Sequence, residues 1–298
     1  MPHPVNIEND LLRLQVWPQV GGKVTSVVDK SDGFDLLFGY PTELPEQPTY
    51  DVTYGDAWYA GWDECFPAIA PGPYMGHPYD GVRVPDHGEL WGLPTVAVPT
   101  KNGITCVWHG LRFGYRLTRK LYLDGPTLHS EYTLVNLAPF PFRFVWAMHS
   151  LMSMTSPVEL DAGASKQWRF SHDADGLEFH REFDWPTVTE GVNVSAPHDL
   201  PAKQAWKLYT MQPIVSPFMV RYPKRRRSLT IEYDAGDTGP AGHWGIWLNT
   251  GGWAGVKHFA IEPTIGRYDA LDRAIRDHSA GTVDASAKIE WSVRWTVS

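Results

Sequence analysis

The chain has 298 residues, of which 43% are hydrophobic and 13% aromatic, enough for a large core. Its formal net charge of −8 leaves no general basic surface for nucleic-acid phosphates, so a nucleic-acid partner is not expected. Two cysteines, Cys65 and Cys106, are neither a disulfide framework nor spaced as zinc ligands, which favours a reduced, cytoplasmic protein. Because no window approaches 18 apolar residues and the start has no signal-peptide core, neither a membrane span nor secretion is predicted.

Alternation of apolar and polar residues predicts strands along the whole chain. The clearest stretches are 11–18, 103–108, 115–123, 128–136, 141–150, 228–233 and 288–298. Glycine-containing turn signals separate them, and no linker or βαβ rhythm interrupts the series. We therefore expect one all-β domain over residues 1–298, built as a large antiparallel sandwich.

Two short segments carry a helical pattern instead. Residues 267–277 place Leu271, Ala274 and Ile275 at helical spacing, and residues 203–209 are a second, weaker candidate. The basic run at 224–227 follows a proline and precedes a strand, so we interpret it as a solvated hairpin turn rather than a phosphate site.

Residues 40–99 are rich in Pro, Gly, Tyr and Trp and poor in alternation. A long irregular segment inside a compact domain is usually functional, and the aromatic content argues against disorder. We expect ordered loops that cover a sheet face and form one wall of a binding site.

Strand parity indicates where chemistry could occur. In the strand predicted at 142–150, the large apolar side chains share one face, which places His149 on the other. In residues 258–262, Glu262 likewise lies opposite its large apolar neighbours. A carboxylate raises the pKa of a nearby histidine and the imidazolium lowers that of the carboxyl, so such a pair suits acid–base work near pH 7. Two ordinary polar residues on a solvated face explain the pattern equally well.

His87 lies between Asp86 and Gly88 in the aromatic segment, where it is either a turn histidine or a ligand contact. Sugar rings need an aromatic platform with polar groups around it. Tryptophans near loops are candidates for that platform, although many of the 14 must be core. The predicted substrate-binding set is Trp62, Asp63, Glu64, Trp91, Arg143 and Trp247.

Together these segments resemble the galactose mutarotase-like (aldose 1-epimerase) superfamily. The resemblance lies in "DHGELW", "LHSEYTLVNLAPFPF", "FVWAMHSLMSM" and "FAIEPTIGRYDALDRA", which follow the family order over most of the chain. It implies a β-supersandwich of some thirty strands with an open cleft. Glu262 would be the general base on the anomeric hydroxyl, His149 the general acid on the ring oxygen, and His87 would orient the sugar. No metal or organic cofactor would be required.

Three other functions stay open from the sequence. A hexose-6-phosphate mutarotase needs basic residues around the phosphate; the candidates are Arg83, Arg112, Arg116, Arg119 and Arg143. A sugar-binding module would bind without catalysis. A glycosidase or lyase would use Glu262 with Asp63 or Glu64, and retaining hydrolysis would need the two carboxyl groups about 5–5.5 Å apart. The expected partner is a small-molecule sugar, and the protein is expected to be a monomer or homodimer.

Overall fold

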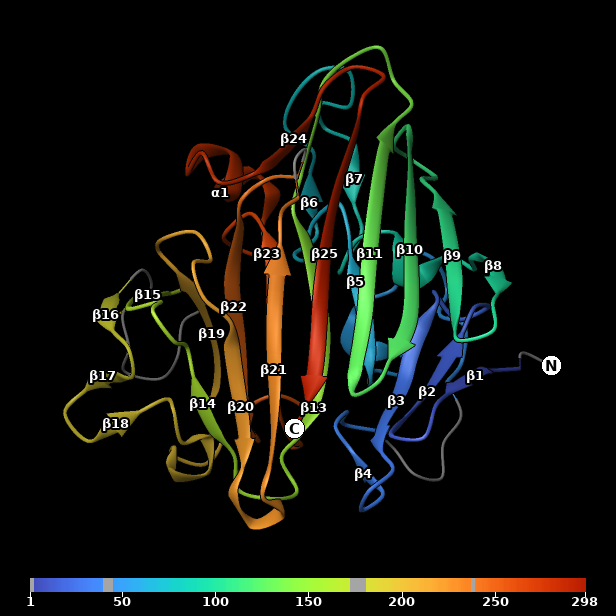
Figure 1. The fold of residues 1–298 in the computed structure, drawn as a ribbon. Coiled ribbons are helices and arrows are strands. Elements are labelled where there is room, and N and C mark those ends of the chain that lie inside the picture. The colour runs from blue at the N-terminus through green and yellow to red at the C-terminus, as the bar shows by residue number, and fades with distance from the viewer. Residues whose placement is uncertain (1–2, 40–44, 172–180, 237–238) are drawn as a thin grey trace.

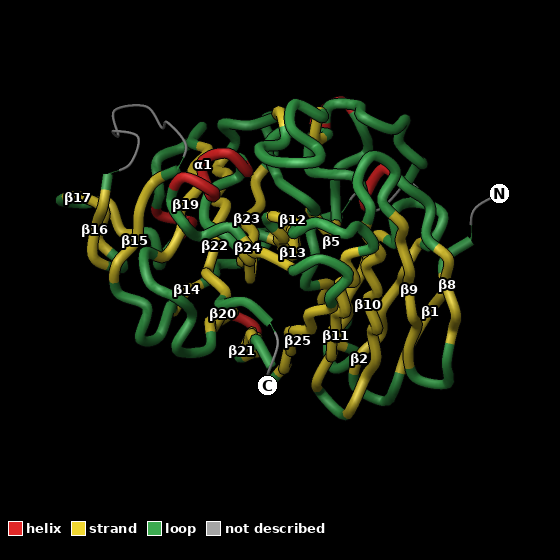
Figure 2. The backbone as a smooth tube through the Cα atoms, turned by 90° about the horizontal axis from the view of Figure 1, so that it is seen from above, coloured by secondary structure: helices red, strands yellow, loops and turns green. Residues whose placement is uncertain are grey.

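The computed structural model describes residues 3–39, 45–171, 181–236 and 239–298 (Figure 1). In these ranges the regular secondary structure is mostly antiparallel β strand, as the alternation predicts. Two large sheets pack face to face; Figure 2 shows them as two layers, with loops and helix α1 (Leu271–Arg276) covering the outer face of one. That covered face holds the site described below.

The larger sheet has eleven strands among the described residues, in the order β1-β2-β3-β5-β13-β23-β22-β19-β15-β16 with β4 paired to β3. They are β1 (Val5–Glu8), β2 (Leu12–Trp17), β3 (Lys23–Asp29), β4 (Phe34–Asp35), β5 (Trp62–Cys65), β13 (Trp146–Ser153), β15 (Gln167–Phe170), β16 (Glu182–Asp184), β19 (Ala205–Thr210), β22 (Gly242–Thr250) and β23 (Lys257–Ile265).

The second sheet has eight strands within the same ranges, in the order β14-β20-β21-β25-β11-β10-β9-β8. They are β8 (Val96–Pro99), β9 (Gly103–His109), β10 (Tyr115–Asp124), β11 (Thr127–Asn136), β14 (Glu159–Asp161), β20 (Phe218–Tyr222), β21 (Arg227–Asp234) and β25 (Lys288–Val297). Three two-stranded pairs complete the structure: β6 (Gly72–Pro73) with β7 (Arg83–Val84), β12 (Phe142–Phe144) with β24 (Gly281–Val283), and β17 (Thr187–Thr189) with β18 (Val192–Asn193).

The core between the sheets is rich in aromatic rings. Trp62 of β5 stacks on Trp295 of β25 with ring centroids 5.6 Å apart, and Tyr132 of β11 meets Trp146 of β13 edge-on at 4.8 Å. Such pairs contribute about 0.5–1.5 kcal/mol beyond the area that they bury. The tryptophans that face inward are therefore structural.

Two of the three local predictions are confirmed. Residues 267–277 contain helix α1, and the basic run forms the turn between β20 and β21, with Arg226 in the left-handed conformation. The prediction of a helix at 203–209 is wrong, because Ala205–Thr210 is strand β19, an interior strand of the larger sheet. Its neighbours on both sides supply the backbone hydrogen bonds that a short amphipathic helix would have made internally.

Within the described ranges, no helix has the length and apolar character needed to cross a membrane.

Candidate functional site

Five adjacent strands of the larger sheet bring the polar side chains of the site together. In the order β5-β13-β23-β22-β19, His149 pairs with Asp63, Gly245 with Glu262, and Lys207 with Trp247. Residues at these positions point away from the second sheet, toward the loops that cover this face. The face therefore collects side chains from sequence positions that are more than 140 residues apart.

His149 and Glu262 meet, as strand parity predicts. His149 Nε2 lies 3.8 Å from Glu262 Oε1, and the apolar neighbours Phe259 and Ile261 belong to the core on the opposite side. Glu262 is fully buried and lies beneath the side chains that line the pocket. Its Oε1 atom has no hydrogen-bond partner among the described residues.

The second oxygen of Glu262 is held by a buried lysine. Lys207 Nζ on β19 donates a hydrogen bond to Glu262 Oε2 and lies 3.5 Å from Asp269 Oδ1. Asp269 follows β23 and also accepts a hydrogen bond of 2.7 Å from the Tyr209 hydroxyl. One ammonium therefore bridges two carboxylates at the floor of the site.

The loop after β7 brings His87 over this floor. Its backbone N–H donates to the Ile69 carbonyl at 2.6 Å, and His87 itself has a positive φ of 57°. Gly88, at φ 76°, passes so close to Phe66 that a Cβ would lie 2.1 Å from the Phe66 carbonyl oxygen. Only glycine permits this approach, which fixes the position of His87.

Tyr54 and Asp86 orient His87. The Tyr54 ring stacks on the imidazole with centroids 3.8 Å apart, and Asp86 Oδ1 lies 2.8 Å from His87 Nδ1. Asp86 Oδ2 accepts a 2.9 Å hydrogen bond from the Tyr54 N–H. The His87 Nδ1 contact leaves Nε2 for another partner, and the ring lies 5.0 Å from that of His149.

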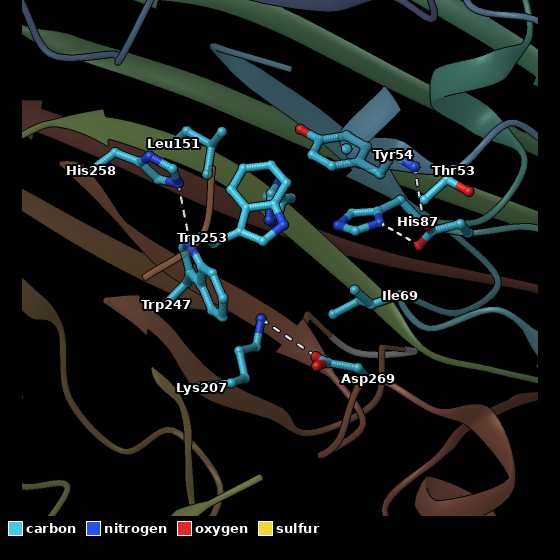
Figure 3. Close-up of a pocket in the computed structure, with 13 residues that line it drawn as sticks. Thr53, Tyr54, Ile69, His87, Leu151, Lys207, Trp247, Trp253, His258 and Asp269 are labelled. Atoms are coloured by element: carbon cyan, nitrogen blue, oxygen red, sulfur yellow. Dashed lines mark hydrogen bonds and ion pairs between the residues drawn. The ribbon is translucent and has the colours of Figure 1, made fainter. Parts of the chain in front are cut away.

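Aromatic side chains form the opposite wall. Trp247 Nε1 donates to His258 Nε2 at 3.2 Å, and Trp253 meets His258 edge-on at 6.1 Å (Figure 3). These residues face His87 and Tyr54 across a pocket of about 290 Å³, with Lys207 and Asp269 between them. The lining residues are Thr53, Tyr54, Gly55, Ile69, Asp86, His87, His149, Leu151, Lys207, Trp247, Trp253, His258 and Asp269. The described part of the aromatic segment, residues 45–99, supplies one wall, as predicted; residues 40–44 lie outside the described ranges. The expectation of loops throughout is wrong at Trp62–Cys65 and Val96–Pro99, which are strands β5 and β8 of the two large sheets.

Burial shifts the pKa values of both central groups. It lowers the pKa of His149 well below its ordinary range, assisted by the charges of His87 and Lys207. The expectation that a carboxylate raises this pKa is wrong, because desolvation of the imidazolium outweighs the attraction. Burial also raises the pKa of Glu262, opposed by Lys207. Burial would lower the pKa of Lys207, yet the carboxylates of Asp269 and Glu262 more than offset this and raise it.

Of the predicted substrate-binding residues, Trp247 lies in the pocket wall and four others do not reach it. Trp62 and Glu64 point into the core between the sheets, where the Glu64 carboxylate accepts hydrogen bonds from Arg119, Tyr132, Trp146 and Trp62. Trp91 is buried behind Tyr54, and its Nε1 donates to the Asp86 carbonyl at 2.7 Å. Arg143 is exposed on β12, outside the pocket lining.

Asp63 lies on the pocket side of β5, and one of its two oxygens is paired. Its Oδ2 accepts hydrogen bonds from Lys23 Nζ and, at 3.0 Å, from the Tyr54 hydroxyl, so this oxygen supports Tyr54. Its Oδ1, like Glu262 Oε1, is buried and has no hydrogen-bond partner among the described residues. Asp63 therefore lies beneath the pocket lining, as Glu262 does.

The sequence interpretation missed Tyr54, Lys207 and Asp269. The sequence does contain an indication of Lys207, because a lysine inside the alternating run "AWKLYT" is unusual for a buried strand. The helical interpretation of that run concealed it. Tyr54 begins a one-turn 3-10 helix, Tyr54–Asp56, and Asp269 lies in a loop, and spacing along the chain gives no information on the orientation of either side chain.

Neither a protein-family model nor a curated protein sequence matches the chain. Several solved structures, in contrast, are similar to the chain over almost its whole length. A protein from Synechocystis sp. PCC 6803 has 18% sequence identity and a TM-score of 0.73, covering 100% of this chain and 96% of that one. A putative aldose 1-epimerase from Escherichia coli K12 has 13% identity and a TM-score of 0.71, covering 100% and 99%. A galactose mutarotase-like protein from Lactobacillus casei has 16% identity and a TM-score of 0.72, covering 99% and 100%. The chain therefore has the galactose mutarotase-like β-sandwich fold.

Proposed function

We propose that the protein is a mutarotase that interconverts the α and β anomers of an unphosphorylated sugar. The observation that carries the proposal is the contact between His149 Nε2 and Glu262 Oε1, 3.8 Å apart at the pocket floor. Because Oε1 is buried and has no donor among the described residues, a sugar hydroxyl placed between the two groups would satisfy it. The likeness to putative aldose 1-epimerases supports the same chemistry.

Glu262 acts as the general base. As the bond between C1 and the ring oxygen breaks, its carboxylate takes the proton of the anomeric hydroxyl, which reaches Oε1 between His149 and Lys207. Lys207 holds the other oxygen and opposes the effect of burial on the pKa, which favours the ionised form that a base requires. The product of this step is the open-chain aldehyde.

His149 delivers a proton to the ring oxygen. Since burial lowers its pKa, the imidazole is neutral at pH 7 and carries one N–H donor and one acceptor. Nε2 faces Glu262, so Nδ1 is the donor. Nδ1 gives its proton to the ring oxygen while Nε2 receives the proton held by Glu262, so protons balance without an imidazolium. After rotation about C1–C2, closure on the opposite face of the aldehyde reverses these transfers.

His87 and the tryptophans position the sugar. Asp86 holds His87 Nδ1, so Nε2 is available to a sugar hydroxyl. The flat, weakly apolar face of a pyranose fits against Trp247 or Trp253. This arrangement holds the anomeric centre over the floor of the pocket.

Polarimetry on freshly dissolved α-anomers tests the proposal. General acid–base groups contribute about 10²–10⁴-fold, so Glu262→Gln and His149→Gln should each lower the catalysed rate at least about 100-fold. Glu159→Gln and His109→Gln, at exposed strand positions, serve as matched controls. The rate should show no acid limb near pH 6.5 from His149, because its pKa is lowered. If no sugar in a broad panel equilibrates faster with the protein, the proposal fails.

A sugar-binding module is the second candidate, and the Lys207–Glu262 ion pair favours it. A carboxylate that shares its charge with an ammonium is a weaker base than a free one. This function would give a measurable sugar Kd by calorimetry with no change in mutarotation rate.

The other two alternatives find less support. No arginine of the described chain lines the pocket, and its lysine, Lys207, is already paired with Glu262 and Asp269. A phosphate would therefore lack the expected partners. The glycosidase alternative assigned Asp63 or Glu64 as the partner of Glu262, whereas Glu64 points into the core and Asp63 is paired with Lys23.

A further inference from the structure

A thiol lies beside the two pocket histidines. Cys65, His87 and His149 each present a potential ligand atom, and these three atoms lie within 4.8 Å of one another. Cys65 is a free cysteine on the pocket side of β5, beneath the imidazoles. Thiolate and imidazole are the ligands that Zn²⁺ prefers in proteins.

One of the two histidines, His87, has the outer contact through its second ring nitrogen that metal-bound imidazoles commonly have. Asp86 Oδ1 lies 2.8 Å from His87 Nδ1, which is the carboxylate–histidine contact that orients a ligating imidazole through its other nitrogen. The Nδ1 atom of His149 is buried and has no hydrogen-bond partner among the described residues. A buried ring nitrogen without a partner is unfavourable, and a ligand bound to it would remove that penalty.

The dimensions fit one small ion. Three atoms no more than 4.8 Å apart leave a point about 2.8 Å or less from each of them. Zinc–sulfur and zinc–nitrogen bonds are about 2.3 and 2.0–2.1 Å. The ligand atoms therefore need to move inward by about 0.5–0.8 Å at most for the ion to bind.

We propose that Cys65, His87 and His149 form a binding site for a zinc ion, with its fourth coordination position facing the pocket that His87 and His149 line. On binding, the thiol of Cys65 releases its proton to solvent and the thiolate binds the metal. Water or a ligand hydroxyl takes the fourth position. Metal binding itself is independent of the sugar reaction. One consequence rests on the proposed function: an occupied site removes a nitrogen of His149 from proton transfer and blocks mutarotation.

Calorimetry and cobalt spectroscopy on tag-free protein, pretreated with a chelator, test the site. We expect one Zn²⁺ per chain, and Co²⁺ should give the near-ultraviolet thiolate-to-metal absorption. Cys65→Ala should abolish that absorption and weaken zinc binding at least about tenfold, and Asp86→Asn should weaken it about 10–100-fold. Cys106→Ala is the matched control, since Cys106 is also free and buried but lies on β9 of the other sheet.

Two results would overturn the proposal. The first is a cobalt complex of the unsubstituted protein without thiolate absorption, which needs no variant to fold. The second is equal zinc affinity in Cys65→Ala and Cys106→Ala, which would place the ion elsewhere. Both readouts are independent of polarimetry, so a failed metal site and a failed mutarotase are distinguishable.

Discussion

Replacing Lys207 with methionine tests the electrostatics of the pocket floor. Glu262 is fully buried and Lys207 opposes the upward shift of its pKa, so the variant should raise this pKa further. Without Lys207, the buried carboxyl of Glu262 can become neutral by binding a proton. For Glu262 alone, the cost at pH 7 is therefore limited to that of protonating a glutamate of ordinary pKa 4.5, which is about 1.36 kcal/mol for each of 2.5 pH units, or about 3.4 kcal/mol.

The sign of the pH dependence follows from the same reasoning. A carboxyl whose pKa is raised in the folded state holds a proton that the unfolded chain has lost, so stability falls as pH rises above 4.5. Urea unfolding at several pH values should therefore show Lys207→Met close to the unsubstituted protein at pH 5 and up to about 3.4 kcal/mol less stable at pH 7. Lys120→Met breaks the half-exposed pair with Glu131 and should cost less than about 1 kcal/mol at either pH. A Lys207→Met penalty that does not change with pH would refute the reasoning.

Three further substitutions probe the support of the site. Glu64→Ala leaves the buried Arg119 guanidinium unpaired and should lower the free energy of unfolding by about 3–5 kcal/mol, measured in urea; a loss below 1 kcal/mol would contradict the pairing. Gly88→Ala places a Cβ against the Phe66 carbonyl and should cost at least about 1–2 kcal/mol and weaken sugar binding, read by thermal unfolding and calorimetry; unchanged sugar affinity would show that His87 has not moved. Trp253→Ala should raise the sugar Kd about tenfold, or about 1.4 kcal/mol, with unfolding unchanged, because Trp253 is only half-buried; an unaltered Kd would remove it from the sugar site.

Period-two alternation in the sequence predicted both the all-β fold and the shared face of His149 and Glu262. Period-two alternation fixes which side chains share a face, so His149 and Glu262 could be assigned to one surface before their strands were known to be neighbours. The same rule, applied to β5, separates Glu64 from Asp63: adjacent residues on a strand point to opposite faces, so the two could not both bind one ligand. Because "WDEC" was predicted to be part of a loop, this alternation was not applied to Asp63 and Glu64.

Strand order accounts for what the sequence did not reveal. Lys207 reaches Glu262 because β19, β22 and β23 are neighbours, and no local pattern states that order. The lowered pKa of His149 depends on the same assembly, since burial and the charge of Lys207 arise only when the sheet is complete. Spacing along the chain can name candidate groups, whereas their protonation states follow from tertiary contacts.

The charges of the finished pocket also select among substrates. The Lys207 ammonium faces the carboxylates of Asp269 and Glu262, and Asp86 adds a third carboxylate beside His87. Hydrogen bonds to Asp86 outweigh the effect of burial and lower its pKa, which keeps it ionised at neutral pH. One cation against three anions repels a phosphate or a sugar acid but accepts neutral hydroxyls, which donate to carboxylates at no charge penalty. A hexose should therefore bind more tightly than its 6-phosphate, and the difference should shrink as salt is added; a preference for the phosphate would contradict this reading of the charges.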